Sequence, residues 1–373
     1  MSRRSAPPGA GVAFVLASYA PDTPAGMERA TAALAEGLHR IGHRPIIITA
    51  STPRPPSPQM VELSSLTIAF PTDDQTLRDA ITSAGGVIRA ELAAILDDHE
   101  IDVVVYVDAL WGLGRLMADH PAHTVLAAHV LGHTEDLLPA LGTADRVVAP
   151  SPTVIHEAAA RGIETEHWQV VPNALLYDQP PPTPEQAERR RQGGPLRVLA
   201  RPAENKGVPD LLQALPAGLD RHVDVILAPA PFDAGPGVQQ QVIARCQQYR
   251  RPNVSLSTRP LAWSQVPSWL AEAAVVIVPS RAETFGLVAL EALGCGVPVV
   301  AYDIGNLPDL VGTRDDAGGV IVEHSAGPAE LWRAALELTQ DAVAYLHASR
   351  AAYYRSRDFR PTCIAERFMK AVW

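Results

Sequence analysis

Residues 278–298 read Val-Pro-Ser-Arg-Ala-Glu-Thr-Phe-Gly-Leu-Val-Ala-Leu-Glu-Ala-Leu-Gly-Cys-Gly-Val-Pro. The apolar run at 273–278 that leads into this stretch predicts a buried strand. A loop with a carboxylate at Glu283 follows, and from Gly286 the leucine spacing predicts a helix that stops at 294–296. A strand, a loop and a helix in this order present free backbone N–H groups and the positive end of a helix dipole to an anion. The stretch therefore predicts a phosphate-binding turn in an α/β fold.

Two carboxylates flank this turn, because Glu291 lies eight residues after Glu283. Five helical residues at about 1.5 Å each place Glu291 roughly 7 Å along the axis from the helix start. This separation lets one carboxylate bind the ribose of a nucleotide while the other faces the group beyond the diphosphate. The pair predicts a ligand made of a nucleotide diphosphate and a hydroxyl-rich group. The alternative is a pair of solvated charges on a loop and a helix.

The composition indicates a protein of two domains with sizeable cores, since 373 residues include 47% apolar and 19% charged residues. A net charge of −10 argues against a nucleic-acid groove. Three scattered cysteines are too few for a disulfide framework or a zinc site and predict reduced thiols in a cytoplasmic protein. We expect neither a signal peptide nor a membrane span, because no apolar run is long enough.

Apolar strand patterns alternate with helical patterns along the chain, which predicts parallel sheets. The expected strands lie at 11–17, 46–49, 66–70, 103–107, 124–128, 146–149, 197–200, 223–228, 254–257, 274–278, 299–302 and 319–322. A proline-rich stretch at 178–195 predicts a linker between a domain at 1–177 and a domain at 196–357. We expect a last helix, at about 358–373, to cross back to the first domain. Two doubly wound Rossmann-like domains facing across a cleft are the predicted fold.

With these residues in hand, the chain resembles a glycosyltransferase of the GT-B architecture, family 4, over nearly its whole length. The motifs that carry the resemblance are Glu283 to Glu291, Gly296-Val-Pro-Val-Val-Ala301 with Gly305-Asn-Leu-Pro-Asp309, Val171-Pro-Asn173, Arg201-Pro-Ala-Glu-Asn-Lys206-Gly207, Gly26-Met-Glu28 and Leu38-His-Arg-Ile-Gly42-His43. The sequence departs from the family pattern at Ala25 and Ala174, where glycine is usual, and at 228–237, where a glycine-rich turn is expected. These changes concern the local shape of the pockets.

The resemblance implies a donor site in the second domain. Glu283 would bind sugar hydroxyls and Glu291 the ribose. Arg201 and Lys206 would neutralise a diphosphate leaving group, where negative charge grows as the glycosidic bond breaks. A plain surface-charge role is the alternative, although lysine is scarce in this chain, with Lys206 and Lys370 the only two. The residues expected around the diphosphate and the sugar are Gly26, Thr284, Phe285, Gly286 and Leu287.

The resemblance also places residues of the first domain beside the acceptor and the sugar. His129, at the end of an expected strand, would approach the sugar, and a core histidine is the alternative. Glu28, Asp108 and Trp111 would contact the acceptor; a first-turn helix acid and a packing indole are the alternatives for Glu28 and Trp111. His129 and His133 fit an H-x3-H metal pair, but no third ligand is recognisable beside them, so we expect no metal.

The resemblance implies a retaining glycosyltransferase that moves a sugar from a UDP- or GDP-sugar to a soluble acceptor, and we expect it to need no metal. A hydroxyl, a thiol or an amine is the expected nucleophile, and a small polar natural product is the expected acceptor. No Asp-x-Asp and no P-loop occurs in the chain. Two alternatives remain: a nucleotide-sugar 2-epimerase or phosphorylase on the same fold, and a non-catalytic protein that binds a sugar nucleotide.

Overall fold

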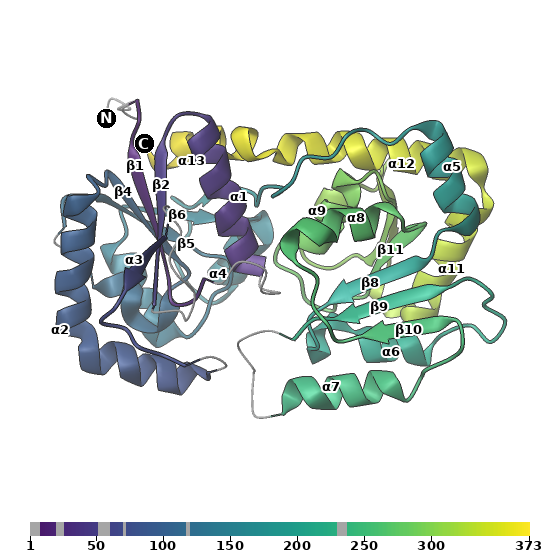
Figure 1. Ribbon diagram of the computed structural model, residues 1–373, viewed down its shortest axis with the longest axis horizontal. Helices are drawn as coiled ribbons and strands as arrows, with labels where there is room; N and C mark the ends of the chain where they lie inside the picture. The colour runs from purple at the N-terminus through teal and green to yellow at the C-terminus, as the bar shows by residue number, and fades with distance from the viewer. Residues whose placement is uncertain (1–7, 20–25, 51–59, 70–71, 117–119, 230–236) are drawn as a thin grey trace. The chain divides into compact units, whose positions relative to one another are not determined.

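The computed structural model describes residues 8–19, 26–50, 60–69, 72–116, 120–229 and 237–373. These residues form two compact α/β units, each built on its own sheet (Figure 1). Unit 1 holds the described residues as far as Leu176 together with Phe359–Trp373, and unit 2 holds Tyr177–Asp358. Neighbouring strands are parallel in both sheets, so the predicted doubly wound α/β class is confirmed.

Unit 1 has a seven-stranded sheet in the order β3-β2-β1-β4-β5-β6-β7. Its strands are β1 Gly11–Leu16, β2 Arg44–Ala50, β3 Met60–Leu63, β4 Val103–Val107, β5 His123–Ala127, β6 Arg146–Ala149 and β7 Gln169–Val170. Its helices are α1 Gly26–Arg40, α2 Asp74–Asp98, the 3-10 segment η1 Leu110–Arg115, α3 Thr134–Thr143, α4 Pro152–Ala160 and α13 Pro361–Val372. Every residue of β1 and β4 is buried, as expected for central parallel strands covered by helices on both faces.

Helix α13 joins the end of the chain to unit 1 by packing on α1. The two helices touch at Gly37, where an added Cβ would lie 2.1 Å from the carbonyl oxygen of Pro361. Farther along α13, the ring of Phe368 lies 6.4 Å from the ring of Phe14 in β1. Glycine at position 37 therefore sets how closely α13 approaches α1.

Unit 2 has a six-stranded sheet in the order β10-β9-β8-β11-β12-β13. Its strands are β8 Leu196–Ala200, β9 Val223–Leu227, β10 Val254–Ser257, β11 Val275–Val278, β12 Val299–Tyr302 and β13 Gly319–Val322. Its helices are α5 Pro184–Gly193, η2 Glu204–Lys206, α6 Val208–Gln213, α7 Val238–Gln247, η3 Trp263–Gln265, α8 Val266–Ala271, α9 Leu287–Gly294, α10 Leu307–Val311, η4 His324–Ala326, α11 Pro328–Gln340 and α12 Ala342–Ser356, with η5 Arg357–Phe359 at the unit boundary. Among the described residues, no helix has the length and apolar character needed to cross a bilayer.

The predicted strand at 66–70 is wrong, because the third strand lies earlier, at Met60–Leu63. Leu66 follows a turn and is buried in the core at 1% exposure, so its apolar character reflects packing and not strand pairing. The backbone N–H groups of Ser64 and Ser65 donate to the carboxylate of Glu91 in α2, at 2.9 and 2.8 Å. Phe70, the last residue of the predicted strand, lies outside the described residues.

The proline-rich stretch at 178–195 contains a helix as well as connecting chain. Helix α5 begins with a capping box, in which Thr183 Oγ1 accepts from the Gln186 N–H and Gln186 Oε1 accepts from the Thr183 N–H. Arg190 of α5 donates to the carbonyl oxygens of Cys295 and Gly296, at 3.0 and 2.9 Å. This part of the expected linker therefore packs into unit 2.

We expect Gly37→Ala to lower the free energy of unfolding by about 1–3 kcal/mol, the usual cost of overpacking a core. The clashing atom is a backbone oxygen, which cannot rotate away. Thermal and urea unfolding would measure the change. Gly86→Ala is the matched control, because Gly86 of helix α2 has no atom within 4 Å of an added Cβ. The control should be neutral or stabilising by about 0.5–1 kcal/mol. Equal melting of Gly37→Ala and the wild type would contradict the prediction.

Candidate active site

The candidate donor site lies at the carboxyl edge of the sheet of unit 2. Strand order reverses around β8, which pairs with β9 on one side and with β11 on the other. Doubly wound sheets bind ligands at such a switch point, outside the carboxyl ends of the strands. The loop after β8 carries Arg201 and Lys206, and the loop after β11 carries Glu283. The topology therefore gathers three residues predicted from sequence at one edge.

Backbone contacts hold these two loops together. Gly207 has a φ of +67°, and a Cβ added to it would lie 2.1 Å from the carbonyl oxygen of Pro279. The N–H of Arg281 donates to the carbonyl oxygen of Asn205 at 2.8 Å. The turn η2 is thus fixed directly against the chain that leaves β11.

Lys206 and Glu283 meet in an ion pair at this contact. Lys206 Nζ lies 2.7 Å from Glu283 Oε2, and the two side chains are only 16% and 15% exposed. A charge-assisted hydrogen bond in a partly buried setting is stronger and less screened than a surface pair. The structure therefore brings together two side chains that stand 77 residues apart in sequence.

The turn from Glu283 to helix α9 is shaped by glycine on two sides. Gly286 precedes α9 with a φ of +100°, and its added Cβ would lie 2.8 Å from a Leu307 methyl carbon. Gly305, with a φ of +58°, lies so close that its Cβ would come within 1.8 Å of the Glu283 carbonyl oxygen. Asn306 donates from Nδ2 to the carbonyl oxygen of Phe285 at 3.2 Å. Gly305 and Asn306 thus brace the turn, a role that the sequence analysis missed although both stand in its quoted motif.

The other donor-side residues occupy different surroundings around this turn. Phe285 is buried at 3% exposure, whereas Thr284, Leu287 and Glu291 are half-buried. Glu291 stands in the middle of α9, whose other residues from Ala289 to Gly294 are buried. Arg201, directly after β8, is exposed. Their roles towards a ligand stay predictions.

A second charged network borders the turn η2 and was not predicted. Asp210 of α6 forms ion pairs with Arg281 and, at 3.5 Å, with Arg245 of α7. Arg245 also pairs with Glu204 at 2.7 Å. The network links η2, α6, α7 and the loop after β11, because each of these segments supplies one member. The sequence did not predict this network, because its acidic and basic members lie on segments that are far apart in sequence and form no local pattern.

In unit 1, Glu28 has a defined structural partner. Its carboxylate is buried at 3% exposure and accepts a hydrogen bond from Ser18 Oγ at 2.8 Å. The bond ties the first turn of α1 to the chain that leaves β1. Gly26 is the first residue of α1, and Ala25 before it lies outside the described residues.

Asp108, Trp111 and His129 lie after the carboxyl ends of β4 and β5, which are neighbours in the sheet. Asp108 is buried at 6% exposure, and its Oδ1 accepts from the N–H of His129 at 2.6 Å. Trp111 lies in η1 with a φ of +49°, beside Gly112 at +107°. His129 is half-buried, and burial lowers the pKa of its imidazole to about 4. The structure therefore brings Asp108 and His129 into direct contact, which the sequence did not predict.

A small cavity of about 30 Å³ lies beside His129 within unit 1. The cavity is also lined by Thr31 and Leu34 of α1, by Phe368 of α13, and by Asn173, which follows β7. A space of this size holds about one water molecule. Thr31 Oγ1 is buried and has no hydrogen-bond partner among the described residues, which makes the cavity suitable for an ordered water.

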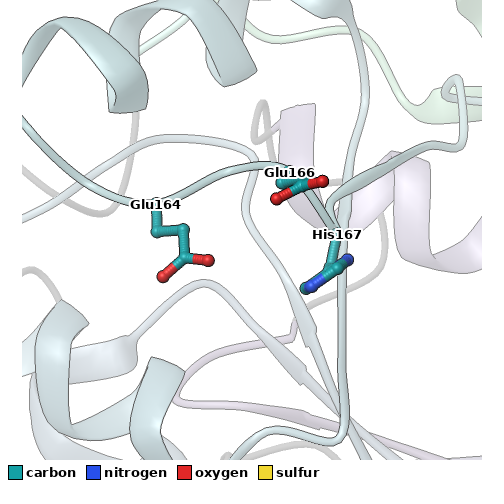
Figure 2. Close-up of side chains that lie close together, drawn as sticks. All are labelled: Glu164, Glu166 and His167. Carbon is teal, nitrogen blue, oxygen red and sulfur yellow. The ribbon is translucent and has the colours of Figure 1, made fainter.

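Among the described residues of unit 1, two groups of possible metal ligands lie on the surface. His133 Nε2 lies 3.4 Å from Asp74 Oδ2, and both side chains are more than half exposed. On the loop between α4 and β7, Glu164, Glu166 and His167 have ligand atoms within 4.8 Å of one another (Figure 2). All three are exposed, and exposed carboxylates gather often without a metal, so we assign none to them. That the site needs no metal stays a prediction.

The fold is that of known two-domain glycosyltransferases of the GT-B architecture. Sucrose-phosphate synthase from Thermosynechococcus elongatus is similar with a TM-score of 0.74 and 18% identity, covering 96% of this chain and 97% of that chain. The catalytic domain of starch synthase IV from Arabidopsis thaliana, bound to ADP and acarbose, has a TM-score of 0.75 and 14% identity, with 98% and 99% covered. An Anabaena protein in complex with UDP and glucose has a TM-score of 0.70 and 18% identity, with 96% and 98% covered. At these identities the likeness concerns the fold.

Sequence comparison identifies the family. Residues 24–179 match the family described as Glycosyltransferase Family 4, and residues 196–341 match the one described as Glycosyl transferases group 1. The first match covers mainly unit 1 and the second lies in unit 2, and together they span most of the chain. The chain therefore belongs to the GT-B glycosyltransferases of family 4, as its motifs predicted.

Curated relatives share part of their length with this chain. A D-inositol 3-phosphate glycosyltransferase of Streptomyces bingchenggensis is 29% identical over 228 residues, which are 58% of this chain and 49% of that protein. A protein of the same name from Catenulispora acidiphila is 46% identical over 80 residues, 21% of this chain and 19% of that protein. The chain thus spans about half the length, or less, of these relatives.

We expect Gly305→Ala to abolish most binding of nucleotide diphosphates, because its Cβ would displace the Glu283 backbone. Binding would be measured as thermal stabilisation of the protein by UDP, GDP and ADP. Gly162→Ala is the matched control, since Gly162 also has a positive φ, +78°, but no atom within 4 Å of an added Cβ. The control places alanine at a positive φ at the end of α4 in unit 1, without the clash. Unchanged binding by Gly305→Ala, or equal losses in both variants, would contradict the prediction.

Proposed function

We propose that the chain is a retaining glycosyltransferase that moves a sugar from a nucleotide diphosphate sugar to a small polar acceptor. The observation that carries the proposal is the Lys206–Glu283 pair, 2.7 Å apart at the switch point of unit 2 and next to the turn that begins α9. An ammonium, a carboxylate and a helix N-terminus in one place suit a ligand that carries both phosphate and hydroxyl groups.

In this proposal, Lys206, Arg201 and the amides around Gly286 bind the diphosphate, Glu283 binds the sugar and Glu291 the ribose. The bond between the anomeric carbon and the diphosphate oxygen breaks as the acceptor oxygen bonds to the same carbon. The acceptor proton passes to the leaving phosphate oxygen, so no protein nucleophile is required. Cations already in place stabilise the charge that develops on the leaving group.

The residues of unit 1 serve the sugar and the acceptor. The His129 imidazole is neutral at pH 7, since burial lowers its pKa to about 4, and a neutral ring can exchange hydrogen bonds with sugar hydroxyls. Trp111 and Glu28 border the acceptor, and Asp108 supports the His129 turn, whose amide its carboxylate binds. The relatives named D-inositol 3-phosphate glycosyltransferase support a small, polar, hydroxyl-rich acceptor.

A screen of sugar nucleotides tests this function. One of UDP, GDP or ADP is expected to raise the melting temperature, since a ligand at 100 times its dissociation constant adds about 2.7 kcal/mol. The matching sugar nucleotide should then be turned over with retention at the anomeric carbon, which NMR of the product determines. Both results should persist in EDTA, because protein cations supply the charge. The proposal would be rejected if none of the three nucleotides stabilised the protein. Turnover of the sugar nucleotide without transfer to an acceptor would also reject it.

Lys206→Ala and Arg201→Ala are each expected to lower turnover by roughly a hundred- to thousandfold, the usual cost of removing one preorganised donor from such a site. Arg201→Lys should not restore the rate, because one ammonium cannot reproduce the guanidinium fork. Lys370→Ala, which removes the chain's other lysine at an exposed position of α13, is the control and should match the wild type. A Lys206→Ala or Arg201→Ala enzyme that keeps more than about a third of the turnover at saturation loses under about 1 kcal/mol and would refute the role.

A further inference from the structure

Asp108 adopts a backbone conformation that is uncommon among non-glycine residues. Its φ is +64°, and among the described non-glycine residues only Glu100 and Trp111 also have a positive φ. Glu100 stands in the turn after α2, whereas Asp108 is buried directly after β4. A strained, buried residue at the ligand-binding edge of a parallel sheet is retained only where its surroundings require it.

The carboxylate of Asp108 holds the backbone that follows the neighbouring strand. Oδ1 accepts from the N–H of His129 at 2.6 Å and from the N–H of Val130 at 3.0 Å. The Asp108 N–H in turn donates to the carbonyl oxygen of Ala127 at 2.7 Å. Three hydrogen bonds from one residue therefore fix the chain at the point where it leaves β5.

The second carboxylate oxygen shows that this arrangement is costly. Oδ2 is buried and has no hydrogen-bond partner among the residues that the structure describes. Burial raises the pKa of Asp108 to about 7, although the two amides oppose the shift. A buried carboxyl group lowers the stability of the folded protein unless its hydrogen bonds compensate. Holding this turn with the Asp108 carboxylate therefore costs stability. The turn that it closes carries His129.

We propose that Asp108 is a positioning residue: its carboxylate fixes the turn at His129 and Val130 and thereby holds the His129 imidazole in its half-buried place at the edge of the sheet. The effect on catalysis rests on the proposed function, in which His129 meets the sugar. The effect on the imidazole does not, because it concerns unit 1 alone.

Two substitutions separate the hydrogen bonds from the backbone conformation. Asp108→Asn keeps one oxygen that can accept from both amides, and asparagine tolerates a positive φ. Asp108→Gly also tolerates the conformation but removes the acceptor. Asp145→Gly is the matched control, since Asp145 Oδ2 accepts from the Thr124 N–H at 2.8 Å, at the opposite end of β5.

The first measurement is the titration of the His129 imidazole by NMR, with its signal assigned by its loss in His129→Gln. The wild type, Asp108→Asn and Asp145→Gly are expected to titrate well below 6, near the value of about 4 that burial sets. In Asp108→Gly the freed turn should admit water and raise the pKa towards the usual value of about 6.5. A His129 that titrates alike in Asp108→Gly and the wild type would overturn the proposal, whatever reaction the protein catalyses.

A second measurement needs no destabilised variant. In the wild type, the amide signals of His129 and Val130 should move together as the pH passes the pKa of Asp108, about 7, and Asp108→Asn should abolish the movement. His129 is the titratable residue that lines the adjacent cavity, and its own titration lies near 4, well separated from this range. Amides that stay still while the Asp108 carboxyl group itself titrates would overturn the proposal even if Asp108→Gly fails to fold.

Kinetics then distinguish positioning from direct contact with the acceptor. Positioning predicts that Asp108→Gly lowers kcat by tenfold or more with little change in the acceptor KM, and that Asp108→Asn recovers most of the rate. A raised acceptor KM in both variants, with His129 titrating as in the wild type, would indicate a direct contact and reject the positioning role. A protein without transferase activity would fail the proposed function while the two NMR measurements still decide this inference.

Discussion

The candidate donor site of unit 2 depends on backbone contacts that only glycine permits. Gly207 lies against the carbonyl group of Pro279, and Gly305 lies against the carbonyl group of Glu283. A Cβ at either position would overlap a backbone oxygen, and a packed interior leaves that oxygen little room to move. The loops that follow β8, β11 and β12 are therefore held together by main-chain packing. The ion pair between Lys206 and Glu283 follows from it, because each partner adjoins one of the two glycine contacts.

In unit 1, the loops at the same edge of the sheet are held together by a carboxylate and not by a glycine contact. There the loops after β4 and β5 are joined by Asp108, whose Oδ1 accepts from two successive amides. A glycine contact costs mainly chain entropy, whereas a buried carboxylate also loses its hydration. The same edge of each sheet is thus held in place in both units. In unit 1 the group that holds it is titratable, and burial raises the pKa of Asp108 to about 7.

Most of the fold could be predicted from the sequence because central parallel strands are buried on both faces and leave continuous apolar runs. The runs at β4, β6, β10, β12 and β13 gave the observed bounds. The two strand predictions that failed also have physical reasons. Leu66 is apolar because it packs beneath a turn, and β7 was missed because it is an exposed two-residue strand with no apolar run.

At the site, the residue types and their order predicted which loops carry the candidate residues. Three contacts could not be predicted, because they join segments that are far apart in sequence and no local pattern encodes them. They are the ion pair of Lys206 with Glu283, the hydrogen bond from Asn306 to the Phe285 carbonyl oxygen, and the hydrogen bond from the His129 amide to Asp108.

The near-absence of lysine also has a structural meaning. Some arginines of unit 2 bind several backbone carbonyl oxygens at once. The buried Arg190 binds those of Ala271, Cys295 and Gly296, and the half-buried Arg221 binds those of Gly194 and Arg191. The planar guanidinium suits that bridging, and withdrawing it would leave buried acceptors unpaired. Lys206 makes a different kind of contact, one ammonium against one carboxylate oxygen in a partly exposed position. A ligand phosphate can share or replace that single contact without opening the backbone. An exchangeable cation therefore stands where the proposed reaction needs one, while the arginines that hold the scaffold keep their partners.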